Sequence, residues 1–275
     1  MRFGFVLPGG TATQQLELAV AAEAAGWDGV FVWEASYAVD PWSLLAAMSQ
    51  RTERVRLGTM LTPLPFRRPW KVASQAATLD ALSGGRAVLA VGLGAVDPEL
   101  GTAGEDTDLR TRADRLDEGI DLIAGLWAGR LAFEGKHYKV DFSAASSVAA
   151  HVTGAKVPIW VVGAWPRPKS MRRVLRCDGI LPTTVAEDGT RLPTVDELRE
   201  LVGWLRDRGG MGPGFDVVME GETPSDDGAK AAEIVGSWRD AGATWWLETR
   251  WQVPPGVNAR EEVMTRIQAG PPPLG

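Results

Sequence analysis

Cysteine and histidine are scarce in this chain of 275 residues, which has one cysteine and two histidines. A single cysteine, Cys177, excludes an internal disulfide bond. It stands beside Asp178 and Gly179 at the start of an expected strand, where we interpret it as a small buried side chain without a redox role. The histidines, His137 and His151, are too few for a zinc hydrolase, which needs several at one site. We therefore predict no metal site.

An excess of basic residues and a long apolar run are also missing. The formal net charge is -6, so the chain has little with which to bind a nucleic-acid backbone or an anionic membrane, and we expect neither partner. No segment approaches the ~20 consecutive apolar residues of a membrane span, and the first residues enter a strand without a cleavable leader. We expect a soluble, cytoplasmic protein.

The most informative segment runs from Val55 to Gly94. Its ends, VRLGTML and RAVLAVGLG, are short apolar runs typical of buried strands, and the part between them has apolar residues at helical spacing. A strand, a helix and a second strand in this order predict two parallel strands joined by a right-handed crossover. Ligands of such proteins bind at the carboxyl ends of the strands.

The same alternation continues along the whole chain and predicts about eight strands and eight helices, which is typical of a (β/α)8 barrel, the TIM barrel. We expect one domain over residues 1–275, with a small hairpin at 131–142 and an extended loop at 143–156 as an insertion. An open doubly wound sheet is the alternative, but the first turn, LPGGTATQQ, lacks its phosphate-binding glycine pattern.

In a barrel, the segments that follow the strands meet at one rim. These are residues 8–9, 34–35, 62–66, 92–97, 163–165, 183–184, 220–222 and 248–251. A Schiff-base aldolase needs a lysine in a strand, and the lysines here fall in helices, loops and strand edges. A glycosidase remains an alternative, because Glu34 with Glu220 or Glu248 would supply two carboxylates.

The rim offers flat apolar surface and glycines, which suits a large planar cofactor that brings its own reactivity. The aromatic residues are Trp33, Phe66, Trp165, Trp246 and Trp251, and the glycines that permit close approach are Gly92, Gly94 and Gly163. Alternatively, the tryptophans of WVVGAW and TWWLETRW fill the barrel.

A phosphate site is predicted between the strand that ends near residue 163 and the helix that follows it, because helix N-termini favour phosphate. Its residues are Gly163, Ala164, Arg167 and Lys169. We interpret Arg172, Arg173 and Arg176, further along this helix, as an ordinary solvated face.

The run LGTMLTPLPFRRPWKVASQAATLDALSGGRAVLAVGLG resembles the bacterial luciferase-like flavin monooxygenases, a family that includes deazaflavin-dependent oxidoreductases. AAGWDGVFVWE, DPWSLLAA, VPIWVVG, DGILP and GATWWLE add to the resemblance. It implies a (β/α)8 barrel that binds FMN, or alternatively the deazaflavin coenzyme F-420, and acts on a small organic substrate. With FMN, a separate reductase would supply reduced flavin. The resemblance also implies a homodimer.

The resemblance further implies a non-prolyl cis peptide at Thr59–Met60 or the next bond, beside the ring of the cofactor. Together with Thr59 and Met60, the predicted cofactor-binding residues are the rim positions Gly92, Gly94, Gly163, Ala164, Arg167, Lys169 and Thr183.

Several positions depart from the family pattern. Glu34 and Ala35 stand where many relatives have Asp-His, so we assign the catalytic proton transfer to Glu34, with a pKa raised by burial. A carboxylate held ionised by an arginine is the alternative. The segment GLGAVDPELGTAGE lacks the usual Glu-Phe pair, and the chain is short after the sixth strand, which predicts an open pocket. A flavin-binding protein without turnover is the alternative function.

Overall fold

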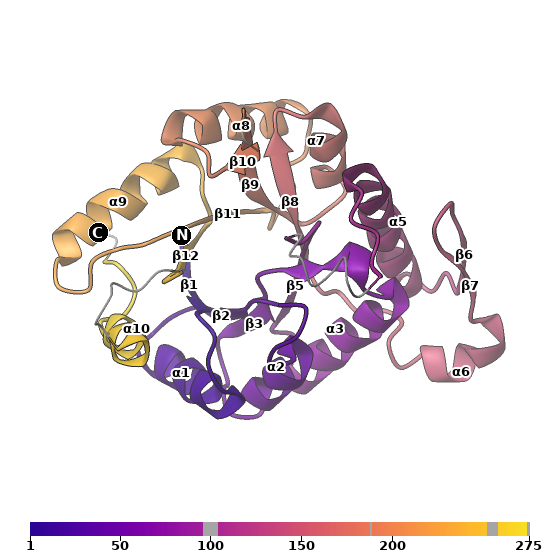
Figure 1. Cartoon of the computed structure of the whole chain (residues 1–275), viewed down its shortest axis with the longest axis horizontal. Helices are drawn as coiled ribbons and strands as arrows, with labels where there is room; N and C mark the ends of the chain where they lie inside the picture. Colours follow the sequence, from indigo (N-terminus) through magenta and orange to yellow (C-terminus); the bar gives the residue numbers. More distant parts are fainter. Residues whose placement is uncertain (96–103, 188, 252–257, 274–275) are drawn as a thin grey trace.

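The computed structural model describes residues 1–95, 104–187, 189–251 and 258–273, and its centre is a closed barrel of eight parallel strands (Figure 1). Each strand pairs with the next in this order, and the last pairs with the first. The strands are β1 Arg2–Leu7, β2 Gly29–Val32, β3 Arg56–Thr59, β5 Ala87–Gly92, β8 Ile159–Trp165, β9 Gly179–Ala186, β11 Asp216–Gly221 and β12 Trp245–Glu248. The predicted (β/α)8 barrel is confirmed.

Helices surround the barrel as an outer ring (Figure 1). In the described ranges they are α1 Ala12–Ala24, α2 Pro41–Ser49, α3 Pro69–Ser83, α5 Leu109–Trp127, α7 Pro168–Val174, α8 Val195–Asp207, α9 Gly228–Ala241 and α10 Ala259–Gln268. Local signals define several ends: Asp40 caps α2 by accepting the N–H of Ser43 at 2.7 Å, and Pro41 follows at the first helical position. No helix in these ranges is long and apolar enough to cross a membrane.

An insertion follows α5 and lies outside the ring of helices (Figure 1). The predicted hairpin is present, since β6 Ala132–Glu134 and β7 Lys139–Asp141 pair antiparallel. The predicted loop at 143–156 is wrong in its first part, which forms the helical turn η2 Ser143–Ala145 and the short helix α6 Ser146–Ala149. Asp141 accepts the N–H of Ser143 at 2.9 Å, which starts the turn.

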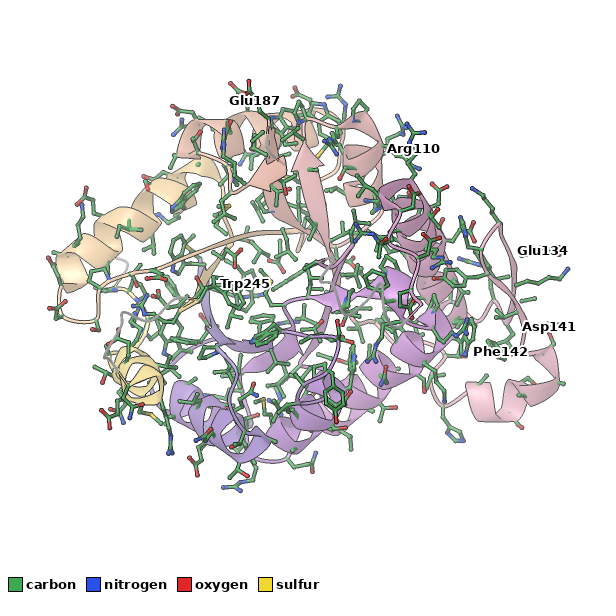
Figure 2. All side chains as sticks on the ribbon, viewed as in Figure 1. Arg110, Glu134, Asp141, Phe142, Glu187 and Trp245 are labelled. Atoms are coloured by element: carbon green, nitrogen blue, oxygen red, sulfur yellow. The ribbon has the colours of Figure 1, made fainter. Side chains whose placement is uncertain are left out.

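Aromatic rings fill the interior of the barrel. Phe31 stacks on Trp160 with ring centroids 5.4 Å apart, and Trp245, labelled in Figure 2 near the middle of the barrel, lies 5.5 Å from Trp160. Gly58 of β3 provides the room, because a Cβ there would lie 2.6 Å from the carbonyl oxygen of Val88 and 3.1 Å from Phe31. The interior is a packed core below the rim rather than a channel.

Two short strands extend the sheet at the rim. β4 Thr62–Pro63 pairs with β5, and β10 Gly189–Arg191 turns back antiparallel onto β9. Between β4 and α3 lies the short 3-10 helix η1 Leu64–Phe66. These segments follow strands β3 and β9, so they build walls at the end of the barrel where its loops converge.

Candidate active site

A cavity of about 840 Å³ opens at the carboxyl ends of the barrel strands. Segments from six parts of the rim and from α5 form its walls. The apolar lining residues are Trp33, Ala35, Met60, Leu61, Pro63, Phe66, Leu93, Ala95, Leu109, Leu116, Val162, Ala164, Leu181, Pro182, Leu192 and Val218. The ionisable lining residues are Glu34, Arg67, Glu105, Arg112, Arg167, Arg173 and Glu220.

Glu34 stands two residues after β2, and its side chain is only 7% exposed. Burial raises its pKa to about 7, although the guanidinium of Arg67 acts in the opposite direction. Arg67 Nε lies 3.1 Å from Glu34 Oε1. The second carboxylate oxygen, Glu34 Oε2, and one guanidinium nitrogen, Arg67 Nη2, are buried and have no hydrogen-bond partner among the described residues. The predicted rise of the pKa by burial is present, and Arg67 pairs with the carboxylate but does not hold its pKa at the ordinary value.

Two threonine hydroxyls near Glu34 form a short hydrogen-bonded series in the barrel wall. Thr62 lowers the pKa of Glu34, and its hydroxyl donates to Thr59 Oγ1 at 3.0 Å. Thr59 in turn donates to the carbonyl oxygen of Ala90 at 3.1 Å. The peptide bond Met60–Leu61 between them is cis, which is the second of the two predicted bonds. The side chains of Met60 and Leu61 line the cavity.

The structure separates the predicted cofactor-binding residues into two groups. Met60, Gly94, Ala164, Arg167 and Thr183 line the cavity, as Glu34 does. The other four, Thr59, Gly92, Gly163 and Lys169, do not. The first three of these are buried behind the wall. A role in cofactor binding stays a prediction for all nine residues.

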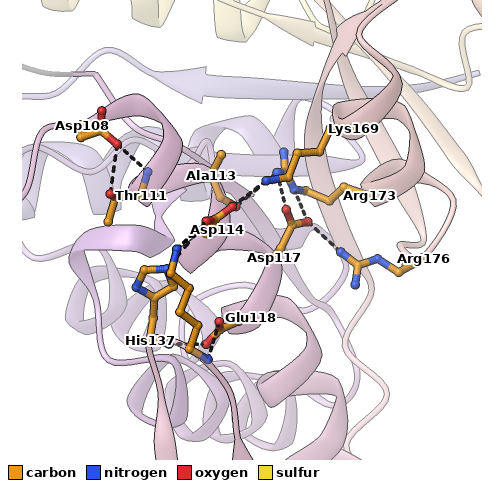
Figure 3. A network of polar contacts seen from close by, with 11 residues as sticks. Asp108, Thr111, Ala113, Asp114, Asp117, Glu118, His137, Lys169, Arg173 and Arg176 are labelled. Atoms are coloured by element: carbon orange, nitrogen blue, oxygen red, sulfur yellow. Dashed lines mark hydrogen bonds and ion pairs between the residues drawn. The ribbon is translucent and has the colours of Figure 1, made fainter.

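The predicted phosphate site is already partly used by the chain itself. The N–H of Ala164 donates to Ser170 Oγ at 2.9 Å, and the peptide bond Trp165–Pro166 is cis. Lys169 points away from the cavity, because its ammonium pairs with Asp114 of α5 at 2.5 Å (Figure 3). Of the basic residues predicted here, Arg167 alone reaches the cavity.

Arg173 is a correction to the sequence analysis, which placed it on a solvated face. Its side chain is 5% exposed and binds Asp117 of α5 through two hydrogen bonds, from Nε at 2.9 Å and from Nη2 at 3.0 Å (Figure 3). Arg176 pairs with Asp117 and Asp121 in the same network, so it too is tied to α5. The i, i+4 spacing of the two aspartates is the only signal in the sequence that pointed to this contact.

Arg112 of α5 was missed by the sequence analysis. Its Nη1 donates to the carbonyl oxygens of Leu93 at 3.2 Å and Gly94 at 3.1 Å, and the guanidinium lies 5.7 Å from the ring centroid of Phe66. Burial lowers its pKa. Arg112 Nε is buried without a partner in the described part of the chain. Residues 96–103, in the segment without the Glu-Phe pair and including the last two of the predicted rim segment 92–97, lie outside the described residues.

The rim tryptophans have different surroundings. Trp33 lines the cavity with Phe66. Trp165 instead packs on Trp204 of α8, with centroids 5.8 Å apart, and Trp246 is buried, with its indole N–H donating to Glu248. Trp251 is 50% exposed. The alternative, in which tryptophans fill the barrel, is right for the interior pair described above, Trp160 and Trp245.

Of the carboxylates considered for a glycosidase, Glu248 belongs to the scaffold. It is fully buried, Arg250 Nη1 lies 2.8 Å from its Oε1, and Thr223 Oγ1 donates to its Oε2 at 2.6 Å. Arg266 of α10 adds a third contact at 3.3 Å. Glu248 therefore anchors α10 to the barrel and is not available to a substrate.

Glu220, the other carboxylate considered, lines the cavity, and burial raises its pKa.

A closed parallel barrel with a mainly apolar cavity at the carboxyl ends of its strands is the arrangement of the (β/α)8-barrel enzymes. Within them, the chain belongs to the luciferase-like monooxygenase family, whose profile matches residues 1–234. The resemblance found in the sequence is confirmed.

Two curated relatives are F420-dependent glucose-6-phosphate dehydrogenases. The protein of Nakamurella multipartita is 32% identical over 213 residues, which are 67% of this chain and 61% of that protein. The protein of Mycolicibacterium fortuitum is 38% identical over 137 residues, which are 46% of this chain and 41% of that protein. The matches thus span about half of the length of the curated relatives.

Solved structures share the fold at lower identity. An F420-dependent secondary alcohol dehydrogenase, in complex with an F420-acetone adduct, superposes with a TM-score of 0.76 at 18% identity and with 97% of each chain covered. The oxygenating constituent of 3,6-diketocamphane monooxygenase from Pseudomonas putida, in complex with FMN, gives a TM-score of 0.62 at 21% identity, covering 81% of this chain and 68% of that one.

Proposed function

We propose that this protein is an oxidoreductase that binds a flavin-type cofactor in the rim cavity, and that this cofactor is the deazaflavin F420. The carrying observation is a mainly apolar cavity at the strand ends with one buried carboxyl group, Glu34, whose pKa of about 7 suits proton transfer. Family membership supports a flavin-type cofactor. The names of the curated relatives support the deazaflavin.

The residues of the cavity fit such a cofactor. A volume of about 840 Å³ lies within the ~300–1,000 Å³ of small-molecule sites. Met60, Leu61 and Val162 offer apolar contact to a planar ring. Glu34 Oε2 and Arg67 Nη2 are buried polar atoms without a partner in the described part of the chain, so a ligand that opens the pair would satisfy both. Arg167 and Thr183 are the residues that would hold a phosphate.

When bound, an oxidised deazaflavin supplies a hydride acceptor. The part of the protein is to position the substrate, to exclude water with the apolar walls and to move one proton. An alcohol that loses a hydride from carbon also loses a proton from oxygen, and we assign that proton to Glu34 Oε2. Arg67 holds the other carboxylate oxygen at 3.1 Å and fixes the orientation of the group.

FMN with a separate reductase is the second candidate, because the family profile is that of monooxygenases. A third possibility is a protein that binds the cofactor without turnover.

We also propose a homodimer, as the family resemblance implies. Light scattering at micromolar concentration that gives the monomer mass would contradict this.

The deciding experiment is titration of the purified protein with F420 and with FMN, followed by absorbance and calorimetry. We expect tighter binding of F420, and loss of its oxidised absorbance band only when an alcohol substrate is added. Tighter binding of FMN, with oxygen uptake when reduced FMN and a substrate are supplied, would favour the monooxygenase. Binding without turnover on any tested substrate would favour the third possibility.

A further inference from the structure

Glu220 is a second buried carboxyl group of the cavity, and unlike Glu34 it has no cation beside it in the described part of the chain. It is the fifth residue of β11, and its Oε2 atom is buried without a hydrogen-bond partner among the described residues. Burial raises its pKa, and hydrogen bonding with the side chain of Trp251 acts in the opposite direction. A buried oxygen without a partner is a place at which a ligand donor would bind.

The arginines of the cavity lie on a different part of its wall. Arg67 follows β4, Arg112 belongs to the helix after β5, and Arg167 and Arg173 follow β8. Strand β5 pairs with β4 and with β8, whereas β9 separates β8 from β11 (Figure 1). The pKa of Glu220 responds to burial and to hydrogen bonding and not to these arginines. The cavity therefore has a basic side and, at β11, a side with an uncompensated carboxyl group.

Two tryptophans belong to the side of the rim that contains Glu220. Trp251 follows β12, which pairs with β11, and Trp33 follows β2 and lines the cavity. A Cβ at Gly9, just after β1, would lie 3.3 Å from the Trp33 ring, so this ring reaches the end of β1. Strands β12 and β1 are the ones between β11 and β2. Indole rings attract cations, and a carboxylate near such rings is suited to an ammonium group.

We propose that the substrate carries a positively charged amino group, which donates a hydrogen bond to Glu220 Oε2 on the side of the cavity formed by Trp33 and Trp251. This inference rests on the proposed function, because it assumes that the substrate occupies the rim cavity. Glu34 keeps the role of accepting a proton, and Glu220 positions the substrate. The proposed phosphate site at Arg167 and Thr183 is on the basic side, so the cofactor and the amino group would use different parts of the wall.

The protonation state of Glu220 is compatible with a cationic ligand. A bound ammonium group favours the ionised carboxylate. Where Glu220 is protonated in the empty cavity, its proton is released when the amine binds. Alkaline conditions favour the ionised form before binding, so the test is made at pH 8. An alkyl ammonium group stays protonated there, because its pKa is near that of a lysine side chain, ~10.4.

The test is calorimetric binding of two ligands with the same ring, cyclohexylmethylamine and cyclohexylmethanol, with and without F420. We expect the amine to bind about 10- to 100-fold more tightly than the alcohol, which is the effect of one charge-assisted hydrogen bond. Bound F420 should keep this order, because its phosphate adds negative charge to the cavity. Equal affinities of the two ligands, or tighter binding of the alcohol, would overturn the inference.

Two matched variants show whether Glu220 is the residue that binds the amine. Glu220→Gln keeps the shape of the side chain and should reduce the affinity for the amine to that for the alcohol. Glu105→Gln is the control, since Glu105 also lines the cavity and the variant removes the same charge. It should change the affinity for the amine by less than roughly twofold, because exposed charges interact weakly through water. The melting temperature of each variant checks folding.

Two outcomes with the variants would contradict the site. An equal loss in both would show that the overall charge of the cavity attracts the amine. An unchanged preference for the amine in Glu220→Gln would place its site elsewhere. Failure of F420 to bind would refute the proposed function, whereas the titrations without cofactor still test the amine site.

Discussion

Arg67 Nε lies 3.1 Å from Glu34 Oε1, while the second oxygen of the carboxylate and the second nitrogen of the same guanidinium edge have no hydrogen-bond partner in the described part of the chain. An arginine and a carboxylate often form two parallel hydrogen bonds, and only one of these contacts is made here. Because burial outweighs the charge of Arg67, the pKa of Glu34 is raised to about 7. Arg67 therefore fixes the orientation of the Glu34 carboxyl group, and this group can exchange a proton near neutral pH.

Replacing Glu34 by Gln should lower turnover by about 10²–10⁴-fold, since the amide keeps the shape of the side chain but exchanges no proton. Cofactor affinity should stay unchanged. In the unmodified protein, alcohol oxidation should rise as the pH increases through about 7, where Glu34 becomes ionised and able to accept a proton. Steady-state rates from pH 5 to 9 check both points. Rates near those of the unmodified protein in Glu34→Gln would reject this role, and weaker cofactor binding would make Glu34 a ring contact instead.

Glu34 should also affect the pH dependence of stability. Its pKa of about 7 in the folded protein lies above the ordinary 4.5, so the folded state binds more protons than the unfolded state between these values. The contribution of Glu34 to the free energy of unfolding therefore falls as the pH rises from about 4.5 to 7, by at most about 3 kcal/mol. Urea titrations at several pH values should show this decline in the unmodified protein and a smaller one in Glu34→Gln. Parallel curves would contradict it.

Replacing Arg67 by Met should raise the pKa of Glu34 above about 7, because the positive charge that favours the ionised carboxylate is removed. The midpoint of the pH profile of activity should move upward accordingly. Arg68→Met is the matched control, since the guanidinium of Arg68 lies over the ring of Trp70 at 5.8 Å and makes no ion pair with Glu34. Infrared titration of the carboxyl band measures the same shift without turnover. A midpoint that stays fixed, or moves equally in both variants, would show that Arg67 does not set it.

Arg167→Ala should weaken cofactor binding about tenfold, because Arg167 lines the cavity and a charged hydrogen bond to phosphate contributes roughly 1.5–3 kcal/mol, less where water screens it. Lys169→Ala should leave the affinity nearly unchanged, because Lys169 pairs with Asp114 outside the cavity. The sequence alone assigned both residues to the phosphate. Titration of each variant, with the melting temperature of the cofactor-free protein as a folding check, separates the two. The reverse order of effects would place the phosphate near Asp114.

Gly58→Ala should destabilise the barrel by about 1–3 kcal/mol, because the new methyl group would lie 2.6 Å from the carbonyl oxygen of Val88, which is backbone. Gly203→Ala is the opposite case: Gly203 lies within α8 with open space at its Cβ position. Alanine is preferred over glycine in a helix, so stability should rise by about 0.5–1 kcal/mol. Thermal unfolding of both variants provides the comparison, and a neutral Gly58→Ala would mean that β3 and β5 can move apart.

Much of the architecture was predictable from local sequence. Apolar runs that alternate with amphipathic helices, the Asp40–Pro41 helix start and the glycine of the 131–142 hairpin each act within a few residues. The rim position of Glu34 followed from its place near the carboxyl end of an expected strand. Family motifs added a cis peptide bond at Thr59–Met60 or the next bond, and the structure has it at Met60–Leu61.

The side of the barrel wall that each residue faces depends on the folded chain. Trp245 fills the barrel whereas its neighbour Trp246 packs on the outer side, because successive residues of a strand point to opposite faces. Arg173 and Lys169 are both engaged by aspartates of α5, more than fifty residues earlier in the chain, so their availability depends on how two helices meet. Short-range patterns along the chain were enough to predict the barrel and its rim. Whether a charged side chain of the cavity is paired within the chain depends on contacts between distant helices. These contacts form only when the ring of strands and helices is closed.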